Sequence, residues 1–210
     1  MKKIPPRITS LDTEELAFLP RWYTKTYFPR FRKPIIMGRR GVFGDGSCFF
    51  HALCAAQNTK NYLHVPPSVQ KSIGHTFRCA FNKHINKQRW AKFLADRHLD
   101  PDVTFPQIQR QFCTSNHWAD EIMITLVTDV LRLNIIFIDT LNGKIYCGVK
   151  GGRKHPLIMI LWNNHKHFEP VFVVREIDGV SQPQFKFFWD KDKDVINSIM
   201  NVYKKQCGNA

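Results

Sequence analysis

Residues 44–53 read Gly44-Asp45-Gly46-Ser47-Cys48-Phe49-Phe50-His51-Ala52-Leu53, and the rest of the chain can be interpreted around them. Two glycines and an aspartate favour a tight turn, and the apolar run over residues 48–56, which lacks proline and glycine, favours a helix. Cys48 is therefore expected at a helix N-terminus. There, unpaired N–H groups and the helix dipole favour the thiolate and lower a thiol pKa that is about 8.5 in a free cysteine. The thiolate is the nucleophilic form of cysteine.

The turn before the cysteine suits a second task. Because glycine can adopt a positive φ, the backbone N–H groups around Gly46 and Ser47 can point at a substrate carbonyl oxygen and form an oxyanion hole. The alternative is a buried structural cysteine after an ordinary Asp-Gly turn. A partner for the thiol favours the first interpretation, and a candidate lies about 120 residues downstream.

That candidate opens the stretch His167-Phe168-Glu169-Pro170-Val171. Residues 157–162 and 167–174 have the pattern of a β-hairpin across a polar turn at 163–166, which puts His167 at the edge of a sheet. Residues i and i+2 face the same side of a strand, so Glu169 is expected beside the His167 ring. A thiol, a histidine that takes and returns its proton, and a group that orients the histidine are the parts of a cysteine protease.

Three stretches resemble, in order and in spacing, the signature blocks of the ovarian tumour (OTU) family of cysteine proteases: residues 45–53, the sequence Trp118-Ala119-Asp120-Glu121-Ile122, and residues 167–171. The resemblance spans about residues 40 to 175. It implies an α/β papain-like fold and cleavage of ubiquitin from proteins or from polyubiquitin chains.

The resemblance also implies roles for matching residues. Cys48 matches the nucleophile and His167 the general base and acid. The family position two after the histidine is often Asp or Asn, and Glu169, one methylene longer, departs from that pattern. Asp45 matches an acid that supports the site, either by shaping the oxyanion turn or by joining the histidine.

Other side chains near these motifs have competing interpretations. His165 is the substitute base, and His51 is expected to support the structure because it is poorly directed toward a substrate cleft. Trp118 and Asn164 are candidate substrate-binding residues. A tryptophan more often lies in the core, and turn chemistry explains the asparagine equally well.

The pattern of the whole chain predicts an α+β fold, with helices packed on a small, mainly antiparallel central sheet. Helices are expected at 13–19, 66–85, 88–95, 104–113, 115–133 and 194–204, the second with an apolar face of Val69, Ile73, Phe77 and Phe81. Strands are expected at 135–139, 144–149, 157–162, 167–174 and 185–189, and Asn142-Gly143 is a type I′ hairpin signal.

Three domain segments are expected: a basic, aromatic-rich N-terminal extension (1–40), an OTU-like catalytic domain (41–175) and a C-terminal extension of a strand and a helix packed on that domain (176–210). Residues 1–10 are expected to be loosely attached or disordered, and 22–31 to wrap the core irregularly. The first 40 residues hold ten Lys/Arg and three acids, a net charge of +7, half of the chain's +14.

Composition bounds the location and the chemistry. The chain has no apolar run of 18 residues and no signal-peptide h-region. We therefore expect an intracellular protein that is neither inserted in a membrane nor secreted. The six cysteines are widely spaced and form no C-x-x-C pair, which favours reduced thiols and argues against a structural zinc site. No cofactor is expected.

These observations lead to one main hypothesis, a deubiquitinase that acts through a thioester on ubiquitin or a ubiquitin-like modifier. A basic protein that binds nucleic acid, or a virion protein, on an inactive OTU scaffold is the alternative that the +14 charge motivates. An OTU-type protease acting on a polyprotein would use the same residues. The basic, aromatic-rich ends would suit a gene of a large DNA virus, which would place the protein in the host cytoplasm or in the virion.

Overall fold

The computed structural model describes residues 8–20, 36–97, 102–114, 116–147 and 155–207. In this part of the chain, one sheet has the strand order β1 (Leu16–Phe18), β2 (Ile36–Arg40), β6 (His167–Ile177), β5 (Leu157–Asn163), β3 (Asn134–Asp139) and β4 (Lys144–Cys147). Strands β7 (Val180–Gln184) and β8 (Lys186–Phe187) pair with β6 and β5. Only the β3–β5 pair among these is parallel. The mainly antiparallel α+β fold is confirmed, although the sheet has more strands than predicted.

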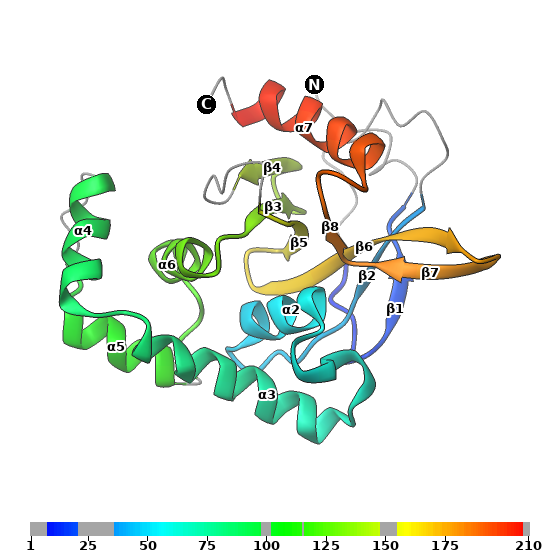
Figure 1. Cartoon of the computed structure of the whole chain (residues 1–210). Coiled ribbons are helices and arrows are strands. Elements are labelled where there is room, and N and C mark those ends of the chain that lie inside the picture. The colour runs from blue at the N-terminus through cyan, green and yellow to red at the C-terminus, as the bar shows by residue number, and fades with distance from the viewer. Residues whose placement is uncertain (1–7, 21–35, 98–101, 115, 148–154, 208–210) are drawn as a thin grey trace.

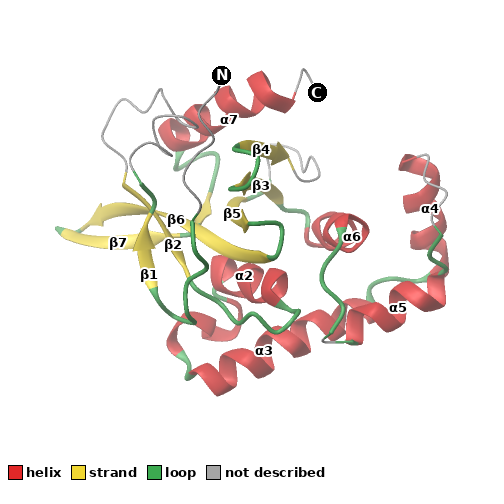
Figure 2. Cartoon of the chain, turned by 180° about the vertical axis from the view of Figure 1, so that it is seen from behind, coloured by secondary structure: helices red, strands yellow, loops and turns green. Residues whose placement is uncertain are grey.

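Helices lie on both faces of this sheet (Figures 1 and 2). One face carries α2 (Cys48–Gln57), with α3 (Pro67–Ala80), α4 (Lys87–Arg97), α5 (Phe105–Cys113) and α6 (Glu121–Leu131) on the same side; short 3₁₀ segments occupy Thr59–His64 and Phe81–Lys83. The opposite face is covered by α7 (Lys193–Cys207). The predicted helices after residue 40 are all present, with bounds that shift by a few residues.

The core has two halves, one on each face of the sheet. Along β5, Ile158 and Ile160 join the cluster on the α2 side, and Met159 and Leu161 join the cluster on the α7 side. Successive strand residues point to opposite faces, so a strand covered on both sides is apolar throughout. This explains why the pattern of β5 shows no polar alternation.

The N-terminal region differs from the prediction. The expected helix at 13–19 is wrong, because Leu16–Phe18 is a strand that pairs with β2. Ile8 is buried, so residues 8–10 are not loosely attached. Since β2 pairs with β6, part of the expected extension belongs to the sheet that carries His167. The division at residue 40 stays a prediction, and residues 1–7 and 22–31 lie outside the described residues.

Helix α3 buries a wider face than the predicted one: Ile73 and Phe77 pack against the core and Phe81 is buried, as predicted, and a second stripe is buried beside them. Gln70, Gly74 and Arg78 are buried, whereas Val69 is 43% exposed. Gly74 is needed here because a Cβ at this position would lie 2.1 Å from Nδ1 of His51. The close contact between α3 and α2 therefore selects a small and polar stripe beside the apolar one.

The two predicted hairpins have different outcomes. Strands β5 and β6 pair across the turn as predicted, with Asn163 opposite His167. The β3–β4 hairpin exists, but its type I′ turn is wrong: the loop runs over residues 140–143, and of Asn142 and Gly143 only the glycine has a positive φ, of 58°. The Asp139 carboxylate accepts the N–H groups of Leu141 and Asn142 and stabilises this longer loop.

The predicted C-terminal strand and helix are present as β8 and α7. Val195, Ile196 and Ile199 of α7 are buried against the sheet. In the described residues no helix is both long and apolar enough to cross a bilayer.

Candidate active site

The cysteine and the histidine stand at the ends of two packed elements. Cys48 is the first residue of α2, His167 is the first residue of β6, and the ring of Phe49 lies 5.5 Å from that of Phe168. The backbone of Phe168 is close enough to the Cys48 thiol to act against the rise in its pKa. A Cβ on Gly44 would lie 4.0 Å from Nδ1 of His167. The turn therefore lies against the imidazole, and the thiol stands at the adjoining end of α2, although these groups are far apart in sequence.

Asp45 shapes the turn before the cysteine. Its Oδ1 accepts the Ser47 N–H at 3.1 Å, and Gly46 has a φ of 79°, which a glycine adopts without strain. The same carboxylate lies 3.3 Å from Nε2 of His51. Burial acts to raise the pKa of Asp45, but the contacts with His51 and Ser47 outweigh it and lower the pKa below 3.8. Of the two predicted roles, the contacts of Asp45 fit the first, and its partner histidine is His51.

His51 has the supporting position that was expected. It is buried, and its Nδ1 lies 2.9 Å from the Tyr62 hydroxyl while Nε2 faces Asp45. The ring therefore links α2, the turn and the 3₁₀ segment behind them. Both ring nitrogens of His51 therefore contact other protein groups.

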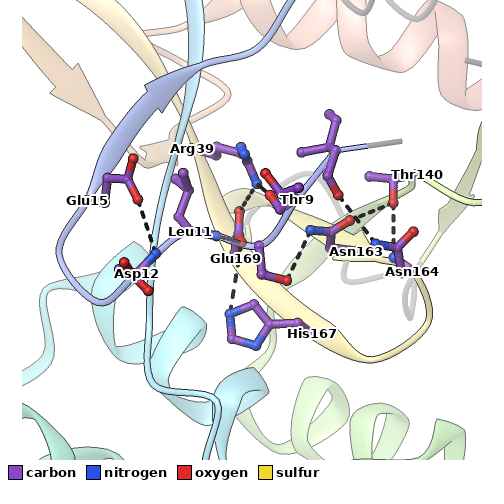
Figure 3. Close-up of polar contacts among 12 residues, drawn as sticks. Thr9, Leu11, Asp12, Glu15, Arg39, Thr140, Asn163, Asn164, His167 and Glu169 are labelled. Carbon is purple, nitrogen blue, oxygen red and sulfur yellow. Dashed lines mark hydrogen bonds and ion pairs between the residues drawn. The ribbon is translucent and has the colours of Figure 1, made fainter. Parts of the chain in front are cut away.

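Glu169 lies on the same side of β6 as His167, as the strand period predicts. Its Oε1 is 3.9 Å from Nε2 of His167, which is beyond hydrogen-bond distance (Figure 3). That nitrogen is buried and has no hydrogen-bond partner among the described residues. Both carboxylate oxygens have other partners: Oε1 accepts the Leu11 N–H at 2.9 Å, and Oε2 pairs with Nη1 of Arg39 at 2.7 Å.

The protonation state of the pair differs from the prediction. Cys48 is 1% exposed, and burial raises the pKa of its thiol to about 11 against the opposing hydrogen bonds of the Phe168 and Phe49 backbones. The expected lowering of this pKa at the helix N-terminus is wrong, because desolvation of the thiolate outweighs the helix dipole. Burial lowers the pKa of His167, and the charges of His51 and Arg39 add to that effect. At neutral pH the site holds a neutral thiol and a neutral imidazole.

The remaining candidates lie around the β5–β6 turn and before α6. Trp118 is 47% exposed, so the interpretation as a core residue is wrong. The Asn164 side chain donates to the Ile8 carbonyl at 3.3 Å, which fits the structural interpretation of this residue. His165 pairs with Asp139 at 2.8 Å and stacks on Trp162, so its ring is engaged on the β3 side of the turn.

One residue that supports the site escaped the sequence analysis. Arg78 of α3 is 0% exposed and donates to the carbonyls of Gly46, Gln111, Phe112 and His117 and to the Ser47 hydroxyl. It thereby ties the turn before Cys48 to the end of α5 and to the residue before Trp118. An arginine on an amphipathic helix resembles a surface residue, and only its position on the buried stripe identifies it.

The sequence matches no protein-family model and no curated protein. Solved structures do match. An OTU domain solved in complex with ubiquitin is 17% identical over 83% of this chain and 90% of that chain, with a TM-score of 0.50. The OTUD1 OTU domain (15% identity, 72% and 93% coverage, TM-score 0.47) and the viral OTU domain protease from Qalyub virus (13%, 77% and 91%, TM-score 0.46) also match.

At these identities the likeness concerns the fold. The protein has the fold of an OTU domain, as the three sequence blocks implied.

Proposed function

We propose that the protein is a cysteine-type deubiquitinase that hydrolyses the bond after the C-terminal glycine of ubiquitin or of a ubiquitin-like modifier. The observation that supports the proposal is the placement of the 44–47 turn, Cys48 and His167 at adjoining ends of α2 and β6 on an OTU fold. The match to an OTU domain solved with ubiquitin supports the choice of substrate.

In the proposed reaction, Cys48 and His167 act together because both are neutral at rest. His167 takes the thiol proton while Sγ attacks the glycine carbonyl carbon and the carbonyl electrons move to oxygen. The oxyanion then collapses, the C–N bond breaks, and His167 returns the proton to the leaving amine. Water, deprotonated by His167, cleaves the thioester, releases the carboxyl group and restores the thiol.

The turn supplies the oxyanion site in this proposal. The Ser47 N–H is already bonded to Asp45, so we assign Ser47 to holding the turn and Gly46 to donating toward the oxyanion. Arg78 donates to the Gly46 carbonyl at 2.7 Å and so holds the turn from outside the proposed oxyanion site. Glu169 is assigned to orienting His167, and the exposed Trp118 to contacting substrate.

The burial of Cys48 sets a condition on this function. A side chain that is 1% exposed cannot be reached by a substrate carbonyl without movement of the groups that cover it. Substrate binding must therefore open the sulfur as well as position the glycine. The sequence hypothesis requires an accessible sulfur, and the present conformation does not provide one.

A ubiquitin derivative with a C-terminal electrophile tests the assignment. We expect covalent labelling of the wild type and none of Cys48→Ala, with Cys113→Ala as the matched control because Cys113 is an exposed thiol on the same side of the sheet. Labelling of Cys48→Ala at the wild-type yield would reject Cys48 as the nucleophile. His167→Ala should abolish turnover of a fluorogenic ubiquitin amide while leaving the far-UV circular dichroism unchanged.

The formal charge of +14 favours nucleic-acid binding as a second candidate function. It predicts retention on a DNA or RNA column that falls steeply with salt, and no hydrolysis of ubiquitin conjugates. Loss of that retention when Lys and Arg residues within positions 1–40 are replaced by Gln would assign it to the basic N-terminal region.

A further inference from the structure

The segment formed by residues 8–12 runs alongside the strand that carries the histidine (Figure 3). It is fastened to the β5–β6 hairpin because the Ile8 carbonyl accepts from Asn164 and the Ser10 hydroxyl accepts from Asn163, at 3.3 and 3.2 Å. One residue further, the Leu11 N–H donates to Oε1 of Glu169 at 2.9 Å. The segment is thus bonded directly to the acid behind His167.

Arg39 fixes the other side of the same carboxylate. It lies on β2 opposite Val171 of β6 and is 6% exposed. Its Nη1 donates both to Oε2 of Glu169, at 2.7 Å, and to the Thr9 carbonyl, at 2.8 Å. One guanidinium therefore joins the 8–12 segment and the acid, as Figure 3 shows.

These contacts answer a physical difficulty of this site. A fully buried carboxylate is costly unless charge and hydrogen bonds compensate it, and Glu has one more rotatable bond than the Asp or Asn expected at this position. Arg39 supplies the charge, and the Leu11 N–H selects the orientation in which Oε1 faces Nε2 of His167. Without them the carboxylate could protonate or turn away.

We propose that Arg39 and the backbone N–H of Leu11 are positioning groups for Glu169, so that the N-terminal segment belongs to the working active site. The catalytic part of this inference rests on the proposed function. When His167 takes the thiol proton it becomes a cation, and a fixed, ionised carboxylate 3.9 Å away stabilises that cation. Arg39 positions the imidazole through Glu169, and its charge also lowers the pKa of His167 directly.

Several other charged or titratable groups face this pair and must be held constant in a test. They come from the 8–15 segment, the turn and α2: Glu15, Asp45, Cys48 and His51. None of them is altered by a substitution at position 39.

The test compares Arg39→Gln, Glu169→Gln and the double variant, using the pH dependence of kcat/KM on a fluorogenic ubiquitin amide. We expect Arg39→Gln to lower kcat by about tenfold with KM unchanged, a small part of the 10²–10⁴ typical of general acid–base catalysis. The acidic limb of the kcat/KM pH profile should move to higher pH, because removing the Arg39 cation raises the pKa of both His167 and Glu169. In the Glu169→Gln background, Arg39→Gln should lower kcat by less than about twofold, because the effects of residues that act as one unit are not additive.

Arg175→Gln is the matched control. Arg175 lies on the same strand and pairs with the buried Asp192 at 2.6 Å, so its loss removes a comparable ion pair away from His167. It should lower the melting temperature and leave the acidic limb in place. Arg39→Lys keeps the charge on a shorter side chain that places its donors differently, so it should leave the acidic limb in place and lose only part of kcat.

Equal losses of kcat from Arg39→Gln in both backgrounds, with an unmoved limb, would overturn the proposal and leave Arg39 a structural residue. An NMR titration of the His167 ring gives a readout without turnover. Losing the Arg39 charge raises the His167 pKa in either background, whereas losing a positioned carboxylate opposes that rise. The rise on Arg39→Gln should therefore be smaller with Glu169 present than in the Glu169→Gln background, and equal rises would overturn the proposal. If the wild type hydrolyses no ubiquitin substrate, the proposed function fails, while this titration still decides the coupling. Should Arg39→Gln not fold, Leu11→Pro, which removes the N–H donated to Glu169, replaces it in the comparison of kcat in the two backgrounds.

Discussion

At the scale of single residues, the site is governed by burial. Cys48 stands at the helix N-terminus that its sequence context predicts, yet its thiol is harder to ionise than a free one. A helix terminus contributes up to about 2 kcal/mol, whereas removing a thiolate from water costs more. In the proposed reaction, nucleophilicity therefore depends on proton transfer to His167 during attack.

The raised thiol pKa predicts slow alkylation of Cys48. With a pKa of about 11, only about one thiol in a thousand is ionised at pH 8, so iodoacetamide should modify Cys48 slowly and faster with each step toward pH 11. Mass spectrometry of the alkylated peptides measures this, with the exposed Cys113 as an internal reference. Modification of Cys48 as fast as Cys113 at pH 8 would contradict the prediction.

His167 makes stability depend on pH. Its pKa is lowered in the fold, so between the folded value and about 6.5 the unfolded chain binds more protons, and stability falls as the pH drops below about 6.5. Urea unfolding at pH 7.5 and at pH 5 should show this loss, and His167→Gln should reduce it. The carboxylates of Asp45 and Asp139, whose pKa values are also lowered, act only below about 4 and fall outside this window. An equal loss in wild type and variant would assign the effect to another group.

At the scale of elements, the two packed termini are held by groups from other parts of the chain. Arg78 of α3 bonds to the turn before Cys48 and to the segment before Trp118, while β2 and residues 8–12 support the back of β6. Arg78 donates to four backbone carbonyls. Because its partners are main-chain groups and not a carboxylate, its structural role cannot be recognised in the sequence. The position of the turn is therefore a property of α3 and α5 as much as of its own glycines.

Arg78→Met is expected to lower the free energy of unfolding by about 3 kcal/mol or more, because it leaves several buried carbonyls without donors. Urea unfolding measures this, and Arg110→Met is the control because Arg110 is exposed and bonds only within its own helix. If both variants lose the same small amount, Arg78 does not have the structural role described. Arg78→Lys should recover only part of the loss, since an ammonium cannot reach so many carbonyls.

At the scale of the whole molecule, the sheet is covered on both faces, and the segment after residue 176 is part of that cover. Val195, Ile196 and Ile199 complete the second half of the core. The helix thus stabilises the strands that position His167 from the side opposite Cys48.

Truncating this contact should destabilise the whole fold. Ile199→Ala is expected to cost about 2–5 kcal/mol, because Ile199 is 0% exposed and its removal leaves a cavity. Asn197→Ala, an exposed position of the same helix, should change stability by less than about 0.5 kcal/mol. Thermal unfolding of the two variants checks this, and a loss below 1 kcal/mol for Ile199→Ala would show that α7 is only loosely attached.

The sequence alone determined the features that depend on neighbours along the chain. The turn and helix around Cys48, the hairpin whose return strand starts at His167 and the α+β class all follow from local periodicity and turn chemistry. The OTU fold was also recognisable, because its three blocks carry their signal locally.

Tertiary structure alone decided what depends on distant neighbours. The strand at Leu16–Phe18, the buried stripe of Gln70, Gly74 and Arg78, and the raised pKa of Cys48 all come from groups that fold onto these residues from elsewhere. Burial and pairing outweigh local propensity by amounts that no window of sequence contains. The partners of Glu169 are the clearest case, since Leu11 and Arg39 are 158 and 130 residues away along the chain and meet the acid only because three strands lie side by side.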